Sequence, residues 1–240
     1  MRVLSRMLQT LVNLCYPPHC TGCQADTEPG SHVCDDCAAG IRRIEPPYCD
    51  RCSNPFDGAI DEIFHCPNCS TRPVHFDHAV APYHSSGIVR ECIHSFKYNH
   101  ARYLRAQLGE WLAESLADPR IAARPFQAFV PVPLHHVRQR EREYNQAEEL
   151  CRDLTKRTGI PTWRALRRIR YTTTQTRLDR DERMENLRGA FQGCETRPVK
   201  ACHLVLVDDV FTTGSTVEEC SRVLLRAGAA SVRVICVARG

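Results

Sequence analysis

The sequence predicts an α/β fold built on a parallel sheet, preceded by a smaller cysteine-rich module that binds metal. Near the end of the chain, two β-branched segments at 203–207 and 231–238 flank an amphipathic helix closed by Gly228. Such a strand–helix–strand unit favours parallel strands with helices on both faces of the sheet. In the first third of the chain, eight cysteines form four C-x-x-C pairs between residues 20 and 69.

The composition is that of a folded globular protein. The 240 residues, with 42% hydrophobic and 25% charged side chains, suffice for one large domain or two small ones. No apolar run approaches the roughly 20 residues that cross a bilayer. Apolar residues at helical spacing predict a short amphipathic helix over residues 1–14, without the continuous apolar segment of a signal peptide. We therefore expect a cytoplasmic protein with no transmembrane segment.

The character of the sequence changes near residue 76, which predicts two domains. Residues 1–75 would hold the N-terminal helix and the cysteine-rich module, and residues 76–240 the parallel sheet. Residues 164–188 are polar, rich in arginine and poorly periodic, which is typical of a lid or a linker. Apolar periodicity predicts further elements over residues 89–98 (helix), 103–116 (helix), 128–132 (strand) and a helix that ends at Gly159.

The segment Leu204–Thr216 carries the strongest chemical signal and reads LVLVDDVFTTGST. Asp208 and Asp209 follow a buried strand, at the edge where open α/β sheets bind ligands, so we expect both to face solvent or ligand. Their carboxylates can accept hydrogen bonds from two ribose hydroxyls or hold Mg²⁺. Gly214 lets a phosphate approach the backbone, and the amides at the start of the next helix form an anion site.

A capped loop beside solvated acids is the alternative interpretation of this segment. The whole string is more specific, because it closely resembles the phosphoribosyl-pyrophosphate signature of type I phosphoribosyltransferases. This resemblance implies that Asp208 and Asp209 are the catalytic acids and that Mg²⁺ binds together with phosphoribosyl pyrophosphate. It also implies a set of phosphoribosyl-binding residues, namely Val210, Phe211, Thr212, Thr213, Gly214, Ser215 and Thr216.

Two further segments narrow the family. Phe129–Gln146 reads FVPVPLHHVRQREREYNQ, and residues 172–191 contain TTTQTRL and RMENLRGAF. With the cysteine pairs and the DD-TTGST loop, the chain resembles the ComF/GntX family along essentially its whole length. The resemblance implies a phosphoribosyltransferase-like domain fused to an N-terminal double zinc ribbon. It also implies a link to natural transformation and to growth on DNA, with imported single-stranded DNA and a competence helicase-type protein as partners.

The same resemblance assigns roles to individual positions. Val132–His135 would face the pyrophosphate, and Asn145 and Gln146 would begin the next helix. Lys97 and Tyr98 match a lysine–aromatic pair of the family, although a lysine at a helix end is ordinarily explained by the helix dipole. The implied pyrophosphate contacts are Arg138, Arg140 and Arg142, for which a charged helix face is the alternative. The implied residues of a closing loop are Gln175, Arg183 and Asn186.

One position departs from the family pattern. Glu143 stands where the family usually has glycine, and it places a negative charge beside the expected phosphate site. We expect its side chain to point outward into solvent. A second group of arginines, Arg164, Arg167, Arg168 and Arg170, suits the phosphates of a ligand or of nucleic acid, or else lies on an ordinary solvated surface.

The eight paired cysteines predict two structural zinc ions. Each zinc ribbon would place two thiolates from each of two knuckles around a tetrahedral ion, and such a filled site has no open position for catalysis. Interleaved pairing of the knuckles remains an alternative, and His19, His32 and His65 lie close enough in sequence to replace a thiolate. Sequential pairing gives a first quartet of Cys20, Cys23, Cys34 and Cys37 and a second quartet of Cys49, Cys52, Cys66 and Cys69.

Two functions from different classes fit these observations. In one, the protein is a Mg²⁺-dependent phosphoribosyltransferase whose acceptor the sequence does not reveal. In the other, it is a non-catalytic DNA- or partner-binding adaptor that uses the same fold. An intact DD-TTGST loop predicts binding of phosphoribosyl pyrophosphate in both cases.

Overall fold

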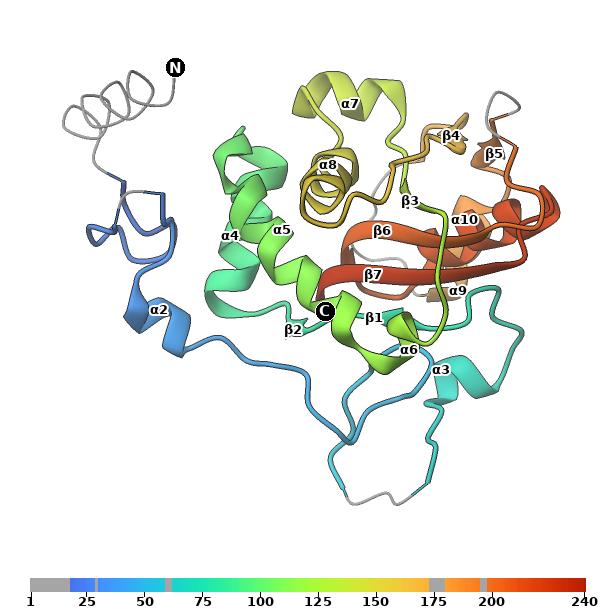
Figure 1. Ribbon diagram of the computed structural model, residues 1–240, viewed down its shortest axis with the longest axis horizontal. Helices are drawn as coiled ribbons and strands as arrows, with labels where there is room; N and C mark the ends of the chain where they lie inside the picture. The colour runs from blue at the N-terminus through green and yellow to red at the C-terminus, as the bar shows by residue number, and fades with distance from the viewer. Residues whose placement is uncertain (1–17, 29, 59–61, 173–179, 195–197) are drawn as a thin grey trace.

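The computed structural model describes residues 18–28, 30–58, 62–172, 180–194 and 198–240. Within them, a 5-stranded parallel sheet forms the centre of the molecule (Figure 1). The order β1-β7-β6-β3 places the two longest strands in the middle, and β2 also pairs with β7. The strands are β1 (Ala79–Val80), β2 (Tyr83–His84), β3 (Ala128–Pro131), β6 (His203–Phe211) and β7 (Ser231–Arg239).

Alternate residues of the central strands face two separate hydrophobic clusters. Leu204 and Leu206 pack into one cluster, and Val205 and Val207 into the other. Helix α10 (Ser215–Arg226) covers the first face, while α4 (Gly87–Tyr98), α5 (Arg105–Ala113) and α8 (Gln146–Thr158) cover the second (Figure 1). The predicted parallel sheet with helices on both faces is therefore confirmed.

The strand that carries the acid pair is longer than expected. We predicted an end near Val207, but β6 continues to Phe211, and beyond Val207 it pairs with β7 at Asp208, Val210 and Phe211. The extra hydrogen bonding to β7 draws both acids into the edge of the sheet. The predicted helix over 103–116 is also divided, into η1 (Arg102–Leu104), α5 and η2 (Glu114–Ala117), and is followed by α6 (Pro119–Ala122).

The segment predicted to be an irregular lid or linker contains regular structure. Strands β4 (Leu166–Arg168) and β5 (Phe191–Gly193) pair in antiparallel fashion, and α9 (Arg180–Leu187) lies between them. Strands of three residues are too short to produce a readable alternation, so the sequence did not reveal them. The role of this segment as a lid stays a prediction. Gln175 lies outside the described residues.

The cysteine-rich part of the chain has little regular structure. It contains α2 (Asp35–Ala39) and α3 (Pro67–Ser70), and the helix predicted over residues 1–14 lies outside the described part. In Figure 1, α2 lies beside α4, whereas α3 lies below the other end of the sheet. None of the described helices is long and apolar enough to span a membrane.

Candidate functional site

A cavity of about 510 Å³ opens at the carboxyl-terminal edge of the sheet. The end of β6 and the following loop form its floor, α4 forms one wall, and the segment after β3 and α7 (His136–Arg142) form another. Arg168 of β4 and Asn186 of α9 also line it. Segments widely separated in the sequence therefore meet where a parallel sheet is expected to bind ligands.

The two adjacent acids have different surroundings. Asp209 is buried, and its Oδ1 lies 2.7 Å from the Nζ of Lys97 at the end of α4. The backbone N–H of Asp209 donates to Oδ1 of Asp208 at 2.9 Å. Both acids line the cavity, as expected for residues that face solvent or ligand, but Asp209 is already paired there with Lys97. A buried carboxylate at this position is tolerable because it is paired.

Burial and charge shift the pKa values of this group of residues. Burial, followed by the negative charge of Asp209, raises the pKa of Asp208 from 3.8 to about 7. Burial by itself would lower the pKa of Lys97, but the charge of Asp209 outweighs it and raises that pKa. Lys97 is therefore a cation at neutral pH, whereas Asp208 can gain or lose a proton there.

The loop after β6 has the geometry of an anion site. Gly214 has φ of +78° and precedes the first turn of α10, in the left-handed region that favours glycine. A Cβ atom built on Gly214 would lie 2.5 Å from Cζ of Phe211. The Thr213 and Ser215 hydroxyls lie 3.0 Å apart. The helix amides that follow point toward the open end of the loop.

The predicted phosphoribosyl-binding residues divide into two groups. Those that line the cavity are Val210, Thr212, Thr213, Ser215 and Thr216. Phe211 is buried beneath Gly214, and its ring packs edge-on against Phe76 at 6.0 Å. Phe211 and Gly214 therefore support the shape of the loop from below rather than lining the cavity.

The three predicted pyrophosphate-binding arginines also differ. Arg138 and Arg142 line the cavity, and each stacks on an exposed tyrosine, Arg138 on Tyr171 at 5.6 Å and Arg142 on Tyr98 at 5.0 Å. Arg140 is exposed on α7 and is absent from the described lining. The helical geometry explains this difference, because residues 138 and 142 share a face of α7 that residue 140 does not.

The turn between α7 and α8 accounts for the unusual Glu143. Its φ of 65° is in the left-handed region, which glycine adopts most easily, and its side chain points outward toward His100 at 3.3 Å. The expected outward orientation is thus confirmed. Asn145 then begins α8, because its side chain accepts from the N–H of Ala147 and donates to the Val132 carbonyl at 3.0 Å. This side chain joins the segment after β3 to the helix.

Two interpretations were open for the group that contains Arg168, and for this residue the structure favours a place beside a ligand over a solvated surface. Arg168 lines the cavity, and burial lowers the pKa of its guanidinium. Arg164 instead pairs with Glu148, and Arg170 donates to the carbonyls of residues 186 and 188. Leu166 and Arg168 lie on the same side of β4, but a strand of three residues gives no signal of this in the sequence. Ser85, Arg90 and His94 also line the cavity, and no sequence motif marked them.

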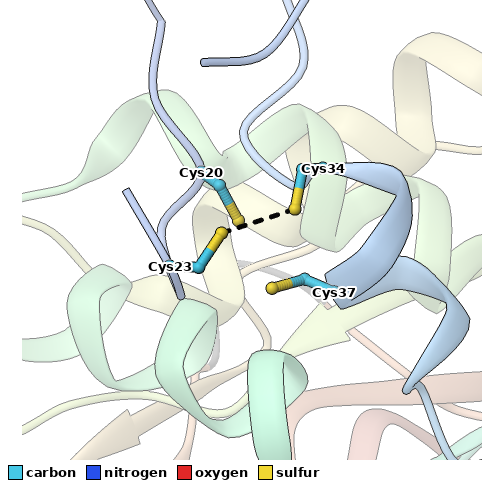
Figure 2. Close-up of side chains that lie close together, drawn as sticks. All are labelled: Cys20, Cys23, Cys34 and Cys37. Carbon is cyan, nitrogen blue, oxygen red and sulfur yellow. Dashed lines mark hydrogen bonds between the residues drawn. The ribbon is translucent and has the colours of Figure 1, made fainter. Parts of the chain in front are cut away.

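The eight paired cysteines form two compact clusters, as predicted by sequential pairing. In each quartet the four Sγ atoms lie within 4.8 Å of one another, a donor set suited to one tetrahedral Zn²⁺. Figure 2 shows the side chains of the first quartet turned toward one another, two of them from the segment that contains α2. Interleaved pairing is excluded for these quartets, and neither of them includes His19, His32 or His65.

A parallel sheet ending in paired acids and a glycine loop is the architecture of a type I phosphoribosyltransferase-like protein, here with an N-terminal zinc-ribbon module. Residues 11–73 match the family described as the double zinc ribbon domain. The two quartets of cysteine thiolates fit two structural zinc ions.

Relatives identify the family. The chain is 31% identical over 230 residues to Competence protein F of Haemophilus influenzae, covering 92% of this chain and 95% of that protein. It is 33% identical over 211 residues to DNA utilization protein YhgH of Salmonella typhi, with coverage of 86% and 90%. Competence protein ComFC of Bacillus subtilis is 24% identical over 211 residues, with coverage of 85% and 82%. The chain belongs to the ComF/GntX family.

Solved structures give partial overlaps. A glutamine phosphoribosylpyrophosphate amidotransferase from B. subtilis superposes with a TM-score of 0.37 at 22% identity, over 56% of this chain and 26% of that one. A hypoxanthine phosphoribosyltransferase of Trypanosoma cruzi gives a TM-score of 0.36 at 13% identity, over 57% of this chain and 64% of that one.

Proposed function

We propose that this chain binds phosphoribosyl pyrophosphate with Mg²⁺ in the cavity at the end of β6 and transfers the phosphoribosyl group to an acceptor still to be identified. The observation that carries the proposal is the meeting of the acid pair, the glycine loop and two arginines in one cavity of about 510 Å³. Each of these groups suits a different part of the same ligand. The names of the relatives support a role for this activity in natural transformation and DNA utilization.

The loop of residues 212–216 would hold the 5-phosphate. Its hydroxyls and the amides at the start of α10 supply donors, and the helix dipole favours a negative charge there. Gly214 leaves the backbone open to the phosphate, while Phe211 keeps the loop in place from below. Gly214 and Phe211 would therefore contribute to binding even though neither residue lines the cavity.

Asp208 would bind the ribose hydroxyls and Mg²⁺. Among the described residues it forms no ion pair, so its carboxylate fits a divalent cation. Asp209 would contribute as an ionised acceptor held in place by Lys97. When bound, Mg²⁺ would supply positive charge against the pyrophosphate group.

Arg138 and Arg142 would bind the departing pyrophosphate, where preorganised cations stabilise charge that develops in the transition state. Arg140, exposed on the same helix, would add to the positive potential at the cavity mouth. Asn186, and with it Gln175 and Arg183, would belong to the segment that covers bound ligand. The position of Asn186 in the cavity lining supports this part of the proposal.

Calorimetry with phosphoribosyl pyrophosphate and Mg²⁺ tests binding, and pyrophosphate release with a panel of nitrogenous bases tests transfer. Asp208→Asn should weaken binding by roughly tenfold or more, since it removes charge-assisted hydrogen bonds. The single variant Asp208→Asn is preferable to a change of both acids, because Asp209→Asn would also leave Lys97 without its partner. Gly214→Val should abolish binding of ribose 5-phosphate, because the new side chain would collide with Phe211.

Arg142→Ala should weaken the binding of phosphoribosyl pyrophosphate more than the binding of ribose 5-phosphate. The matched control is Arg226→Ala, at the exposed far end of α10. If the wild-type protein fails to bind either ligand, the proposal is wrong. Equal losses for Arg140→Ala and Arg142→Ala would show that the whole arginine triplet binds pyrophosphate. A loss confined to Arg142→Ala would restrict the contact to the cavity face of α7.

A non-catalytic adaptor that handles single-stranded DNA or binds a competence helicase-type protein is the second candidate. The observation that favours it is the stacking of two cavity-lining arginines on the exposed rings of Tyr98 and Tyr171. Aromatic rings beside arginines suit single-stranded nucleic acid. This function predicts salt-sensitive DNA binding that Arg138→Glu weakens, together with no pyrophosphate release on any base.

A further inference from the structure

One arginine at the end of β7 connects the second quartet to the loop below the cavity. Arg239 pairs in register with Phe211, the last residue of β6. Its Nη1 donates to the carbonyl oxygen of Thr212 at 3.1 Å and lies 3.4 Å from that of Phe211, and its guanidinium stacks on the Phe211 ring at 5.1 Å. Its Nη2 donates to Oδ1 of Asn54 at 2.7 Å.

Asn54 belongs to the knuckle that carries Cys49 and Cys52. The N–H of Cys49 donates to the Asn54 carbonyl, and the N–H of Ser53 donates to the Cys49 carbonyl, both at 2.8 Å. The buried Ser53 hydroxyl fixes this turn to the sheet by donating to the Ala79 carbonyl at 2.9 Å. Any change in how Cys49 and Cys52 are held must therefore alter the position of Asn54.

Phe211 is the point at which this chain of contacts reaches the ligand loop. The ring is 4% exposed and lies directly beneath Gly214, so its position sets the position of the glycine. A second contact runs in parallel, because the N–H of His75, just after the second quartet, donates to Glu218 in the first turn of α10 at 3.0 Å. Both contacts lead from the second quartet to the start of α10.

We propose that Arg239 is a positioning residue that couples metal binding at the second quartet to the geometry of the loop of residues 212–216. The inference rests on the proposed function, in which this loop takes the 5-phosphate. Arginine suits the role because its planar fork can bond two groups at once without further ordering. A loop held in its binding shape loses less entropy when the phosphate binds, so Arg239 raises affinity without touching the ligand.

Hydrogen exchange of the amides of residues 212–217, measured on zinc-loaded protein without ligand, tests the positioning role. Arg239→Ala should speed the exchange of these amides and weaken ribose 5-phosphate binding by roughly tenfold. Arg239→Lys should lie between Arg239→Ala and the wild-type protein in both measurements. Asn54→Ala should act in the same direction by a smaller factor. Arg43→Ala is the matched control, because Arg43 ties the chain before the second quartet to Glu114, away from the loop.

The double variant Asn54→Ala with Arg239→Ala should behave like Arg239→Ala alone, since both changes break one chain of contacts. Additive effects of the two changes would overturn the coupling. So would unchanged loop exchange in Arg239→Ala. The exchange measurement needs no ligand, so it tests the role of Arg239 even if the wild-type protein binds no ribose 5-phosphate. Failure of the wild-type protein to bind ribose 5-phosphate would refute the proposed function and not the role of Arg239.

Coupling between the sites must also be reciprocal. In the wild-type protein, saturating ribose 5-phosphate should slow the chelator-driven release of one of two zinc ions, and this protection should disappear in Arg239→Ala. Asn54→Ala should reduce the protection. If the ligand binds but zinc release from both quartets is equally fast with and without it, the metal and the loop are independent and the proposal fails.

Discussion

The two cysteine quartets share their ligand chemistry but differ in what surrounds them. All four cysteines of the second quartet are buried, and they pack in the same hydrophobic cluster as residues of β3, β6 and α10. In the first quartet Cys20 is buried, Cys34 and Cys37 are half-buried, and Cys23 is exposed. The second quartet thus lies wholly within the core of the sheet domain. The first reaches the other hydrophobic cluster through Cys20 and otherwise lies at its margin.

The contacts of each quartet with the rest of the protein follow the same division. The knuckle that carries Cys49 and Cys52 bonds to β1 in both directions. The N–H of Ala79 donates to the Arg51 carbonyl at 2.7 Å, and the Ser53 hydroxyl donates to the Ala79 carbonyl. The first module touches the start of α4, where a Cβ on Gly22 would lie 2.8 Å from Ile88. The same C-x-x-C pairs therefore produce one metal site that supports the fold and one that is attached to it.

The largest effect is expected from breaking the second quartet. Cys69→Ser should remove one zinc ion per chain and lower Tm by about 10 °C or more, because metal binding free energy in a polar module is folding free energy. Ribose 5-phosphate binding should fall with it. Metal analysis, thermal unfolding and calorimetry on one preparation measure the three quantities.

Serine at Cys194, a half-buried cysteine outside both quartets, is the matched control and should leave the zinc content unchanged. If Cys69→Ser loses zinc yet unfolds at the wild-type temperature, the second quartet is as peripheral as the first. The difference in burial between the two quartets would then have no effect on stability.

The next effect leaves both quartets intact and breaks the ion pair in the cavity. Lys97→Met leaves the buried carboxylate of Asp209 without a partner, which should cost about 3–5 kcal/mol of unfolding free energy near neutral pH. Denaturant unfolding measures it, with Lys156→Met, an exposed lysine on α8, as control. Adding Asp209→Asn should recover most of the loss, and a double variant no better than the single one would show that the pair contributes little.

The fold was largely predictable from the sequence because its signals are local and repeated. The apolar run 203–207, the helix that follows and the strand at 231–238 each carry their own periodicity, and Gly159 does end α8 in a left-handed conformation. The pairing within the quartets also followed from spacing. Elements of two or three residues, such as β1 and β4, carry no period and were missed.

The motif of the candidate site was predictable from the sequence, but the ion pair between Lys97 and Asp209 was not. The string LVLVDDVFTTGST placed Asp208 and Asp209 correctly at the edge of the sheet, but no local signal separates the free acid from the one paired with Lys97. That difference arises from contact between α4 and β6, 112 positions apart in sequence for Lys97 and Asp209. The burial of Arg168 and the link from Arg239 to Asn54 are long-range for the same reason.

A smaller effect on stability is expected when Asp208 is neutralised, because this change alters the cavity and leaves both quartets intact. A carboxyl whose pKa rises from 3.8 to about 7 on folding binds more protons in the folded state, so the fold loses stability as pH rises through that interval. Asp208→Asn removes this loss. Its stability relative to wild type should therefore increase by about 2 kcal/mol between about pH 5.5 and about pH 8.

Denaturant unfolding across that pH range measures the difference, and Glu91→Gln, an exposed acid on α4, is the control that should show no such trend. A constant difference between Asp208→Asn and wild type would mean that Asp208 keeps an ordinary pKa. Binding should show the opposite trend in wild type, with affinity for Mg²⁺ and phosphoribosyl pyrophosphate rising through about pH 7 as Asp208 ionises.

The smallest effect on the cavity is expected from the first quartet. Cys34→Ser should also remove one zinc ion per chain, because a tetrahedral site that loses one of its four thiolates binds zinc far more weakly. Ribose 5-phosphate affinity should nevertheless stay within about twofold of wild type, and the main unfolding transition within about 2 °C. The physical reason is distance along α4, since the module contacts Ile88 in the first turn while Lys97 lies in the last, about 13 Å further along the helix. A fall in affinity as large as that in Cys69→Ser would show that the marginal quartet reaches the cavity through α4, and the two metal sites would have to be regarded as equivalent supports of one ligand site.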